Sequence, residues 1–572
     1  MKDLTTSLAD VLQQRAVYQP QKLAYRLLKD GEENEISLTY EELDRRARAI
    51  GALLQTATRP GDRVLLLFST GLDFIAAYFG CLYAGVVAIP LTPPHPARVE
   101  KSLAAMLRII DDAKPTAALL NTPLFTAITA KQSVKEKFSK LRLLLTDRED
   151  LDSWADRWEM QGTKGKDLAF LQYTSGSTTT PKGVMVSHAN LLHNLSVLEA
   201  SMELTVDSQI VTWLPPYHDM GLVGGILQGV YTGYTVTLIP HLLFLQRPIR
   251  WLKAISKFKA TTSGGPNFAY ELCLRKIKPA QRDQLDLSSW KIAFNGAEPI
   301  YHKTLEQFAD FFASCGFRRE AFFPCYGLAE ATLMVVGGPK WRAPVSKKVL
   351  KSALENREIV VVSSSDTDSQ VLVSSGQNLA NQNLRIVDPE TLNLCLPDQL
   401  GEIWVNGPSV ASGYWNNREA TANAFAAYLA DSKEGPFLRT GDLGFMNDGE
   451  LYVTGRLKNL IIVDGKNHYP HDLERTLEQA HPAIRPAGCA AFSIAQAGRE
   501  RIVVIVEIQH RSEAEPEAIR SAVRKAIAEN HELKVFDIKL ALPGSIPKTT
   551  SGKIKHFLCK KNYISSTLKE TL

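Results

Sequence analysis

The sequence has little of what marks a secreted, zinc-binding or nucleic-acid-binding protein. Its 572 residues include only seven cysteines, at positions 81, 273, 315, 325, 395, 489 and 559. Their number is odd and no pair has the CxxC spacing of a zinc or redox site, which indicates reduced, mostly buried thiols in a cytoplasmic protein. Lysine and arginine form no dense run and the net charge is only +5, so we expect no binding of nucleic acid.

Signals for membranes or export are also lacking. The first residues, MKDLTTSLAD, have no basic region followed by an apolar stretch, so no signal peptide is expected. Two nearly uncharged stretches, 74–91 and 220–246, are long enough to be weighed as membrane spans. Gly85 divides the first into a helix and a strand, and glycines, threonines and Pro240 interrupt the second. Buried α/β layers explain both better than lipid does, so we do not expect an integral membrane protein.

What the sequence does contain is an alternation of strand-like and helix-like segments. Thr39 and Glu42 form a capping box that begins a helix, and a strand (63–68), a helix (71–84) and a strand (86–91) follow. Further strands are expected at 235–240 and 291–296. Alternation of this kind predicts an α/β fold in which largely parallel sheets are covered by helices on both faces.

The chain is too long for a single hydrophobic core, so we expect more than one domain. From about residue 459 the pattern becomes that of a small α+β domain, which predicts an N-terminal domain of residues 1–457 and a C-terminal domain of residues 459–572. Residues 340–383 have a different, lysine-rich composition with one expected strand at 358–362, and we interpret them as an inserted module or an extended surface loop.

The segment YTSGSTTTPKG at 173–183 concentrates hydroxyl groups before a single lysine. It lies between two expected core strands, as loops that bind phosphate do. It is not a Walker A loop, because Pro181 stands where that motif needs glycine and Gly183 where it needs serine or threonine. Taken alone, the segment is compatible both with a phosphate site and with an ordinary solvated loop.

Six further motifs follow in order: YHDMG (217–221), NGAEP (295–299), YGLAE (326–330), RTGD (439–442), GRLKNLI (455–461) and PKTTSGK (547–553). With the hydroxyl-rich loop they resemble the adenylate-forming superfamily of acyl-CoA synthetases, peptide-synthetase adenylation domains and luciferases, over nearly the whole chain. The stretch LPPYHDMGL and the 340–383 segment are most similar to the fatty acyl-AMP ligases. That resemblance implies an enzyme that activates a fatty acid with ATP and Mg²⁺ to an acyl-adenylate. It then transfers the acyl group to the phosphopantetheine thiol of an acyl carrier protein.

The resemblance also implies roles for single residues. The loop residues expected to hold the β- and γ-phosphates of ATP are Thr174, Ser175, Gly176, Ser177, Thr178 and Lys182, although Thr179 stands where many relatives have glycine. Glu330 corresponds to the magnesium ligand. Tyr326, Gly296, Ala297 and Glu298 correspond to the adenine pocket, Asp442 to the ribose-binding carboxylate, and Arg456 to a second ribose or phosphate contact.

The remaining expected site residues lie far apart in the sequence. The family's equivalent of Lys553 moves in with the small domain and bridges the attacking carboxylate and the α-phosphate. Lys458 corresponds to the hinge between the domains. His218 lies in the family beside the acyl site, so we assign it to substrate positioning. No G-x-S-x-G elbow accompanies it to support a hydrolase reading.

Other functions compete with this one. A fatty acyl-CoA ligase is the first alternative, and the insertion and Asp464, where CoA ligases commonly have a second glycine, argue against it. An amino-acid adenylation domain usually has an aspartate for the α-amino group, and TTSGGPNFAY (261–270) contains none. A non-catalytic nucleotide- or lipid-binding relative would not need Lys553, Glu330 and Asp442 together.

Overall fold

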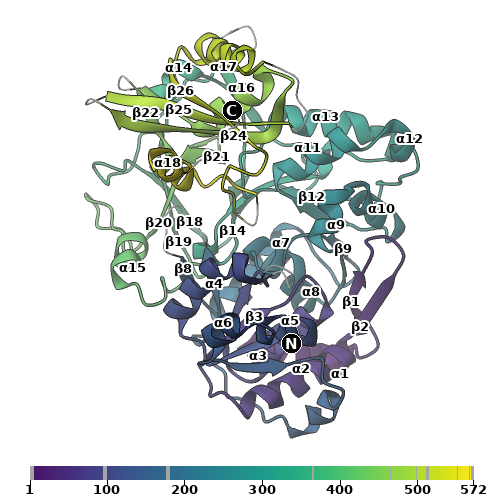
Figure 1. Ribbon diagram of the computed structural model, residues 1–572. Coiled ribbons are helices and arrows are strands. Elements are labelled where there is room, and N and C mark those ends of the chain that lie inside the picture. The colour runs from purple at the N-terminus through teal and green to yellow at the C-terminus, as the bar shows by residue number, and fades with distance from the viewer. Residues whose placement is uncertain are drawn as a thin grey trace.

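Two sheets form most of the N-terminal part of the computed structural model (Figure 1). The described residues are 6–94, 99–174, 181–363, 366, 368–463, 466–496, 499–509, 515–549, 552–565 and 567. The smaller of the two sheets has the order β6 (Arg142–Leu145), β5 (Ala117–Leu120), β3 (Arg63–Leu67), β4 (Val87–Leu91), β7 (Leu168–Thr174), β8 (Lys182–Ser187). Only its β7–β8 pair is antiparallel.

The larger sheet has thirteen strands among the described residues. Its parallel centre consists of β1 (Leu23–Leu28), β10 (Thr235–Leu238), β9 (Gln209–Thr212), β11 (Thr262–Gly265), β12 (Ile292–Asn295) and β13 (Phe322–Gly327). An antiparallel β2 (Glu35–Thr39) extends one end. The other end continues antiparallel through β14 (Met334–Gly337), β17 (Gln377–Asn378), β21 (Glu450–Arg456), β20 (Leu438–Asn447), β19 (Gly401–Asn406) and β18 (Asn383–Val387).

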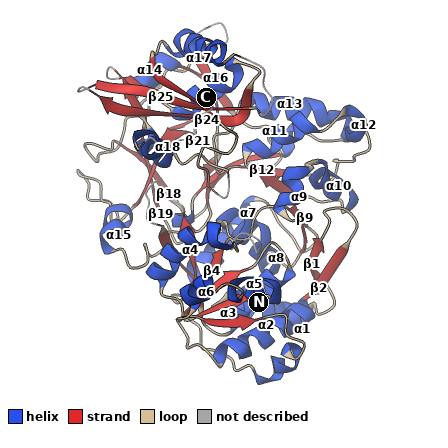
Figure 2. Cartoon of the chain, viewed as in Figure 1, coloured by secondary structure: helices blue, strands red, loops and turns tan. Residues whose placement is uncertain are grey.

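Helices pack around these sheets (Figure 2). Those of the first half are α1 (Leu8–Tyr18), α2 (Tyr40–Gln55), α3 (Leu72–Tyr83), α4 (Val99–Ala113), α5 (Thr122–Thr129), α6 (Gln132–Lys135), α7 (His188–Ser201), a π-helix (Met220–Leu227), α8 (Gln228–Thr232), α9 (His241–Gln246) and α10 (Ile249–Lys257). Later come α11 (Asn267–Lys276), α12 (Pro279–Arg282), α13 (His302–Phe312), α14 (Lys351–Glu355) and α15 (Arg418–Phe425).

Local signals in the sequence explain where several helices begin. Thr39 caps α2 and Glu42 completes the expected capping box. Ser187 likewise caps α7. Gly80 of α3 allows a close approach to α2, since a Cβ at this position would lie only 2.5 Å from Cγ2 of Ile50 in α2. The largely parallel centres of the two sheets and the helices that cover them confirm the α/β fold predicted from the sequence.

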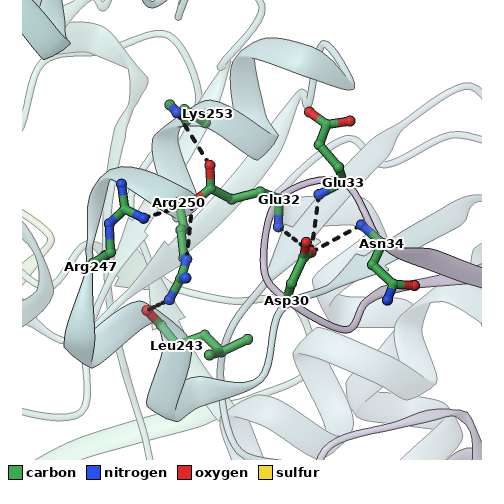
Figure 3. A network of polar contacts seen from close by, with 8 residues as sticks. All are labelled: Asp30, Glu32, Glu33, Asn34, Leu243, Arg247, Arg250 and Lys253. Atoms are coloured by element: carbon green, nitrogen blue, oxygen red, sulfur yellow. Dashed lines mark hydrogen bonds and ion pairs between the residues drawn. The ribbon is translucent and has the colours of Figure 1, made fainter.

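The β1–β2 hairpin is tied to α9 and α10 by charged side chains (Figure 3). Asp30 accepts hydrogen bonds from the N–H groups of Glu32, Glu33 and Asn34, which closes the turn. The Glu32 carboxylate then meets Arg250 at 3.3 Å, and Arg247 and Lys253 also pair with it. These ion pairs join the hairpin to α9 and α10, and His241 and Leu245 of α9 line the cavity described below.

The C-terminal residues form a separate sheet of β24 (Ile484–Gln496), β25 (Arg499–Ile508) and β26 (Val535–Ala541). Helices α16 (Pro470–Ala480) and α17 (Pro516–His531) share one hydrophobic core with these strands, while Cys559 of α18 (His556–Ile564) packs in a second core against them. A short pair, β22 (Ile461–Val463) and β23 (Lys466–His468), precedes α16. The C-terminal part therefore has an α+β structure, as predicted.

The expected strand at 358–362 is wrong. Strands β15 (Ser346–Leu350) and β16 (Ser369–Val373) pair with each other instead. Residues of the expected strand make isolated bridges to different partners, Glu358 to Gln399 and Val361 to Val349. Apolar composition alone could not show that these residues divide their backbone contacts between two neighbours.

Within the described ranges, no helix has the length and apolar character that crossing a membrane requires. All seven cysteines are free, and five of them are buried.

Candidate active site

One large cavity lies beyond the carboxyl ends of β11, β12 and β13 and is bounded on its other side by the C-terminal part of the chain. In α/β folds, ligands bind at this edge of a parallel sheet. The cavity brings together many of the residues singled out in the sequence: Thr174, Lys182, His218, Ala297, Glu298, Tyr326, Glu330, Asp442, Arg456, Lys458 and Lys553. Ser175, Gly176, Ser177 and Thr178 lie outside the described residues, as do Thr179 and Asp464.

One corner of the cavity is built by a β-hairpin and the end of β13. The register of β20 and β21 places Asp442 opposite Arg456, and the Arg456 Nε lies 2.8 Å from Oδ1 of the carboxylate. The Tyr326 hydroxyl donates to Oδ2 at 2.8 Å. Burial raises the pKa of Tyr326, and the Asp442 carboxylate raises that of Arg456. The corner thus holds a fixed carboxylate with charge-assisted hydrogen bonds.

The NGAEP segment follows β12 and takes a tight path. A Cβ at Gly296 would lie 2.6 Å from the Cys325 carbonyl oxygen, and Ala297 has a positive φ of 69°. Gly296 is buried and does not line the cavity, whereas Ala297 and Glu298 do. Glu298 accepts a hydrogen bond from the Phe268 N–H at 2.6 Å. Its carboxylate therefore holds the first turn of α11.

Glu298 also has an unusual protonation equilibrium. Burial raises its pKa to about 7, although the Phe268 N–H and the Lys553 ammonium both lower it. A carboxyl group that titrates near neutral pH inside a cavity is a candidate functional group.

Glu330 lies in a 3-10 turn (Ala329–Ala331) directly after β13. Its Oε1 accepts a hydrogen bond from the Tyr414 hydroxyl at 2.8 Å. The Lys182 ammonium lies 4.5 Å from the centre of the Tyr414 ring. Burial and the neighbouring Lys458 lower the pKa of Lys182, whereas Glu330 raises it. The ammonium groups of Lys182 and Lys458 and the carboxylate of Glu330 thus line the same cavity. Lys182 is placed there by the β7–β8 pair, in which it lies opposite Thr174.

Asp219, next to His218, is the N-cap of the π-helix and accepts from the Met220 N–H at 2.8 Å. Burial raises its pKa, the Lys553 ammonium lowers it, and the Glu330 carboxylate raises it. The His218 ring makes an edge contact with Tyr217, with centroids 5.2 Å apart. The histidine and the aspartate lie in the cavity wall, and the π-helix that follows supplies buried apolar residues.

Lys553 reaches the cavity from the C-terminal part on a narrow turn. The Thr549 N–H donates to the Lys553 carbonyl at 2.7 Å, and the Lys553 N–H donates back to Thr549 Oγ1 at 3.0 Å. Gly552 has a φ of 88°, which favours glycine. The charge of Lys553 acts on both Asp219 and Glu298. A tail residue therefore lines the same cavity as Asp219 and Glu298, which follow β9 and β12.

Tyr414 lines the cavity and donates to Glu330, and the sequence analysis did not single it out. It is 84 positions from Glu330 and comes into place through backbone hydrogen bonds between the 411–415 segment and β8. The Met185 N–H donates to the Gly413 carbonyl, the Met185 carbonyl accepts from Ser412, and the Trp415 N–H donates to the Gly183 carbonyl. Its sequence context, SGYW, could have drawn attention only as an aromatic residue after a glycine.

Comparisons with known proteins agree with this geometry. Residues 12–415 match the family model described as AMP-binding enzyme. Residues 458–571 match a second model, the AMP domain of Disco-interacting protein 2-like proteins.

Among similar proteins, the medium-chain-fatty-acid–[acyl-carrier-protein] ligase JamA of Moorena producens is 44% identical, with 98% of this chain and 96% of that protein covered. A putative fatty-acid–CoA ligase, fadD21, of Mycobacterium leprae is 35% identical, with 98% of each covered. A crystal structure of a fatty acyl-adenylate ligase from L. pneumophila in complex with acyl adenylate and pyrophosphate is 42% identical. It has a TM-score of 0.77 and covers 98% of this chain and 96% of that one.

Proposed function

The chain belongs to the AMP-binding enzyme family, and from this membership we propose that it converts a fatty acid and ATP into an acyl-adenylate and pyrophosphate. It then transfers the acyl group to the phosphopantetheine thiol of an acyl carrier protein. The names of JamA and of the L. pneumophila ligase support the two steps.

The observation that carries the proposal is the position of Lys553. Its charge acts on Asp219 and Glu298 inside a cavity that Asp442, Arg456 and Tyr326 also line. The C-terminal part thus supplies a cation to a cavity at the sheet edge, and a cation there would neutralise the charge that develops on the phosphoryl oxygens.

The first step joins two anions, so alignment and neutralisation of charge dominate its catalysis. A carboxylate oxygen of the fatty acid forms a bond to the α-phosphorus while the bond from that phosphorus to the bridging oxygen breaks. The electron pair leaves with pyrophosphate. Lys553 is proposed to hold the attacking carboxylate and the α-phosphate, while Asp442 binds the ribose hydroxyls and Tyr326 contacts the adenine. We keep His218 as a positioning residue near the acyl chain.

Mg²⁺ is part of this proposal, and Glu330 is its proposed ligand. One Glu330 oxygen accepts from Tyr414, and among the described residues no partner occupies the other. A single carboxylate suits Mg²⁺, which completes its shell with phosphate oxygens and water. When bound, the ion would neutralise charge on the phosphates.

We also propose that Lys458 is the hinge between an N-terminal domain of residues 1–457 and a C-terminal domain of residues 459–572. It lies in a 3-10 turn (Leu457–Asn459) that joins β21 to β22. The family model that begins at residue 458 supports this division. The boundaries of the inserted module, 340–383, and a cytoplasmic location remain predictions.

The test is an acceptor assay with the full-length chain. Labelled fatty acids, ATP and Mg²⁺ are incubated, and either CoA or a holo carrier protein is then added. We expect acyl-AMP to persist with CoA and to be consumed by the carrier. A chain that forms no acyl-AMP with any fatty acid would contradict the proposal and leave the non-catalytic binding role.

A fatty acyl-CoA ligase is the second candidate, because fadD21 of M. leprae bears that name. Rapid formation of acyl-CoA in the same assay would favour it over carrier acylation.

A further inference from the structure

A buried carboxylate of the C-terminal sheet binds the segment that leads to Lys553. Glu507 lies in β25 and is fully buried. Its Oε1 accepts hydrogen bonds from the N–H groups of Gly544 and Ile546, both at 2.9 Å, and its Oε2 pairs with the Arg485 guanidinium. A buried carboxylate is strongly unfavourable unless it is paired and hydrogen-bonded. Glu507 meets that condition through two N–H groups of one short turn and one arginine.

The neighbouring strand bulges around this carboxylate. The register of β24 and β25 shifts so that residues 485–488 bulge beside Glu507. A Cβ at Gly488 would lie only 3.0 Å from the Cβ of Glu507, so a larger residue there would press on the carboxylate's stem. The Ala487 carbonyl of the bulge accepts a hydrogen bond from the Lys548 ammonium. Both Glu507 and the bulge therefore bind residues of the 544–548 stretch.

Backbone contacts connect this stretch to Lys553. Lys548 and Ile554 form an antiparallel bridge. Within that bridge, the Thr549 N–H donates to the Lys553 carbonyl at 2.7 Å, and the Lys553 N–H donates to Thr549 Oγ1 at 3.0 Å. The position of the Lys553 backbone is thus set by the stem of the turn, which Glu507 joins to the sheet.

Packing does not fix the tip of this turn. Gly552 and Lys553 are both exposed. Ile546, at the other end of the stem, is only 4% exposed and shares a hydrophobic core with Cys559 of α18. The attachment of the turn to the domain therefore lies in its stem, where Ile546 contributes apolar packing and Glu507 contributes hydrogen bonds.

We propose that Glu507 is a positioning residue for adenylation, which holds the stem of the turn so that Lys553 reaches the attacking carboxylate and the α-phosphate. This inference rests on the proposed function, which gives Lys553 that task. A misplacement of about 1 Å, caused far from the reacting atoms, can slow a reaction about a hundredfold. Loosening the stem should therefore slow adenylation, whereas ATP, whose ribose and adenine are assigned to Asp442 and Tyr326, should bind almost as before.

The experiment compares Glu507→Ala with Glu507→Gln in the full-length chain. The glutamine keeps an oxygen that can accept from both N–H groups, and the alanine keeps none. Rapid-quench assays with labelled fatty acid give kcat and the KM for ATP in acyl-AMP formation. We expect Glu507→Ala to lower kcat at least about tenfold with the KM within about twofold, and Glu507→Gln to restore most of the rate. Transfer of supplied acyl-adenylate to a holo carrier protein should stay near the parent rate.

A second comparison asks whether Glu507 acts through Lys553. Glu507→Ala is also made in the Lys553→Ala background, and the slow residual adenylation is followed over hours. If the stem only serves to place Lys553, the second substitution should cause no further loss, because the effects of coupled residues do not add. An equal loss in both backgrounds would overturn the proposal, since Glu507 would then act on the fold and not on Lys553.

Two further variants separate positioning from stability. Arg485→Gln is milder than Glu507→Ala, because Arg485 is 43% exposed and its loss leaves the hydrophobic core intact. It should lower kcat in the same direction by about threefold, as expected for a weakened hydrogen bond. Tyr563→Phe removes a hydrogen bond of 2.8 Å between α18 and Asp537 of β26 and serves as the control for the same domain. It should adenylate at the parent rate.

Unchanged adenylation in both Glu507→Ala and Arg485→Gln would show that the anchor is wrong, as would an equal loss in Tyr563→Phe. Failure of the proposed function is recognised separately, because the parent itself then forms no acyl-AMP. Hydrogen exchange still tests the anchor in that case. Amides of 544–549 and 552–555 should exchange faster in Glu507→Ala than in the parent, and equal exchange would overturn the anchor.

Discussion

At the scale of single residues, the best-defined contact in the site is the one between Tyr326 and Asp442. The phenol donates to a carboxylate that Arg456 holds from its other oxygen. Tyr326→Phe removes this donor and keeps the ring. We expect the KM for ATP to rise about fivefold, as for loss of one hydrogen bond of about 1 kcal/mol, with a smaller change in kcat. Steady-state kinetics check this, and Tyr428→Phe at an exposed position is the control. An unchanged KM would show that the hydroxyl does not hold Asp442 in place for the nucleotide.

Glu298 provides a prediction about pH. Its pKa is raised to about 7, so the folded protein keeps a proton that the unfolded chain loses near its ordinary value of 4.5. The stabilisation that Glu298 contributes is complete below the pKa it has in the unfolded chain. It is lost as the pH rises through the pKa it has in the folded protein. Glu298→Gln should therefore remove a fall in unfolding free energy between about pH 4.5 and 7, at most about 1.4 kcal/mol per pH unit.

Chemical denaturation of parent and variant across this pH range measures the effect. Glu271→Gln, a neighbouring carboxyl of the same cavity, serves as comparison. Equal pH slopes for the parent and Glu298→Gln would mean that Glu298 is ionised throughout in the folded state.

The sequence predicted Tyr326, Glu330, Asp442 and Lys553 as candidate site residues because each lies in an ordered motif, and all four line the cavity. Tyr414 escaped because its link to Glu330 exists only when the 411–415 segment pairs with β8. The contact of Glu298 with the Phe268 N–H was also not predictable, since a motif names a residue without showing which way its side chain points.

At the scale of elements, α14 (Lys351–Glu355) makes a defined contact with β23. Glu355 lies 3.2 Å from Lys466 Nζ and 3.6 Å from His468 Nδ1, and its carbonyl accepts from Asn467 at 2.8 Å. Glu355→Gln removes the carboxylate and leaves the carbonyl contact. Since partly exposed ion pairs contribute up to about 1 kcal/mol, we expect a modest local loosening and no loss of the fold.

Hydrogen exchange resolved by peptide checks the Glu355 prediction. Amides of 346–355 and 466–468 should exchange several times faster, whereas those of β3 and β4 should not change. Glu517→Gln on α17, which removes an exposed ion pair, is the control. Equal exchange in parent and Glu355→Gln would show that the backbone contact alone joins the two elements.

Helices and turns with strong local sequence signals were predictable, whereas segments whose structure depends on distant backbone partners were not. The caps of α2 and α7 and the turn at Asp448 and Gly449 follow from residue types. The segment 358–362 has the composition of a strand but bridges to two different neighbours, which no local pattern reveals.

At the scale of the whole molecule, α16 of the C-terminal part contacts the start of α13. The Arg475 guanidinium lies 3.8 Å from the centre of the Tyr301 ring. If the domains rotate about Lys458, this contact must break. Arg475→Ala should therefore favour other domain arrangements and slow adenylation severalfold, while the transfer of a supplied acyl-adenylate is retained.

Energy transfer between dyes on the two domains, read together with the two partial reactions, tests the role of Arg475. Arg520→Ala on α17, which lies outside the cavity lining, is the control. A variant with the parent's dye distance and adenylation rate would exclude a role for this contact in holding the domains together.

The α/β class and the C-terminal α+β unit could be predicted from alternating patterns. The union of parallel strands with β14 and β17–β21 in one sheet could not, because those antiparallel strands come from distant parts of the chain. The cavity depends on that union, since β20 and β21 bring Asp442 to Tyr326 of β13.

The most direct test of the whole account is a rapid-quench comparison of the parent with Lys553→Ala. We predict that acyl-AMP formation falls by at least about a thousandfold, or about 4 kcal/mol in activation free energy, while ATP still binds. Transfer from supplied acyl-adenylate to a holo carrier protein should proceed near the parent rate. Formation of acyl-AMP by Lys553→Ala at the parent rate would contradict the account.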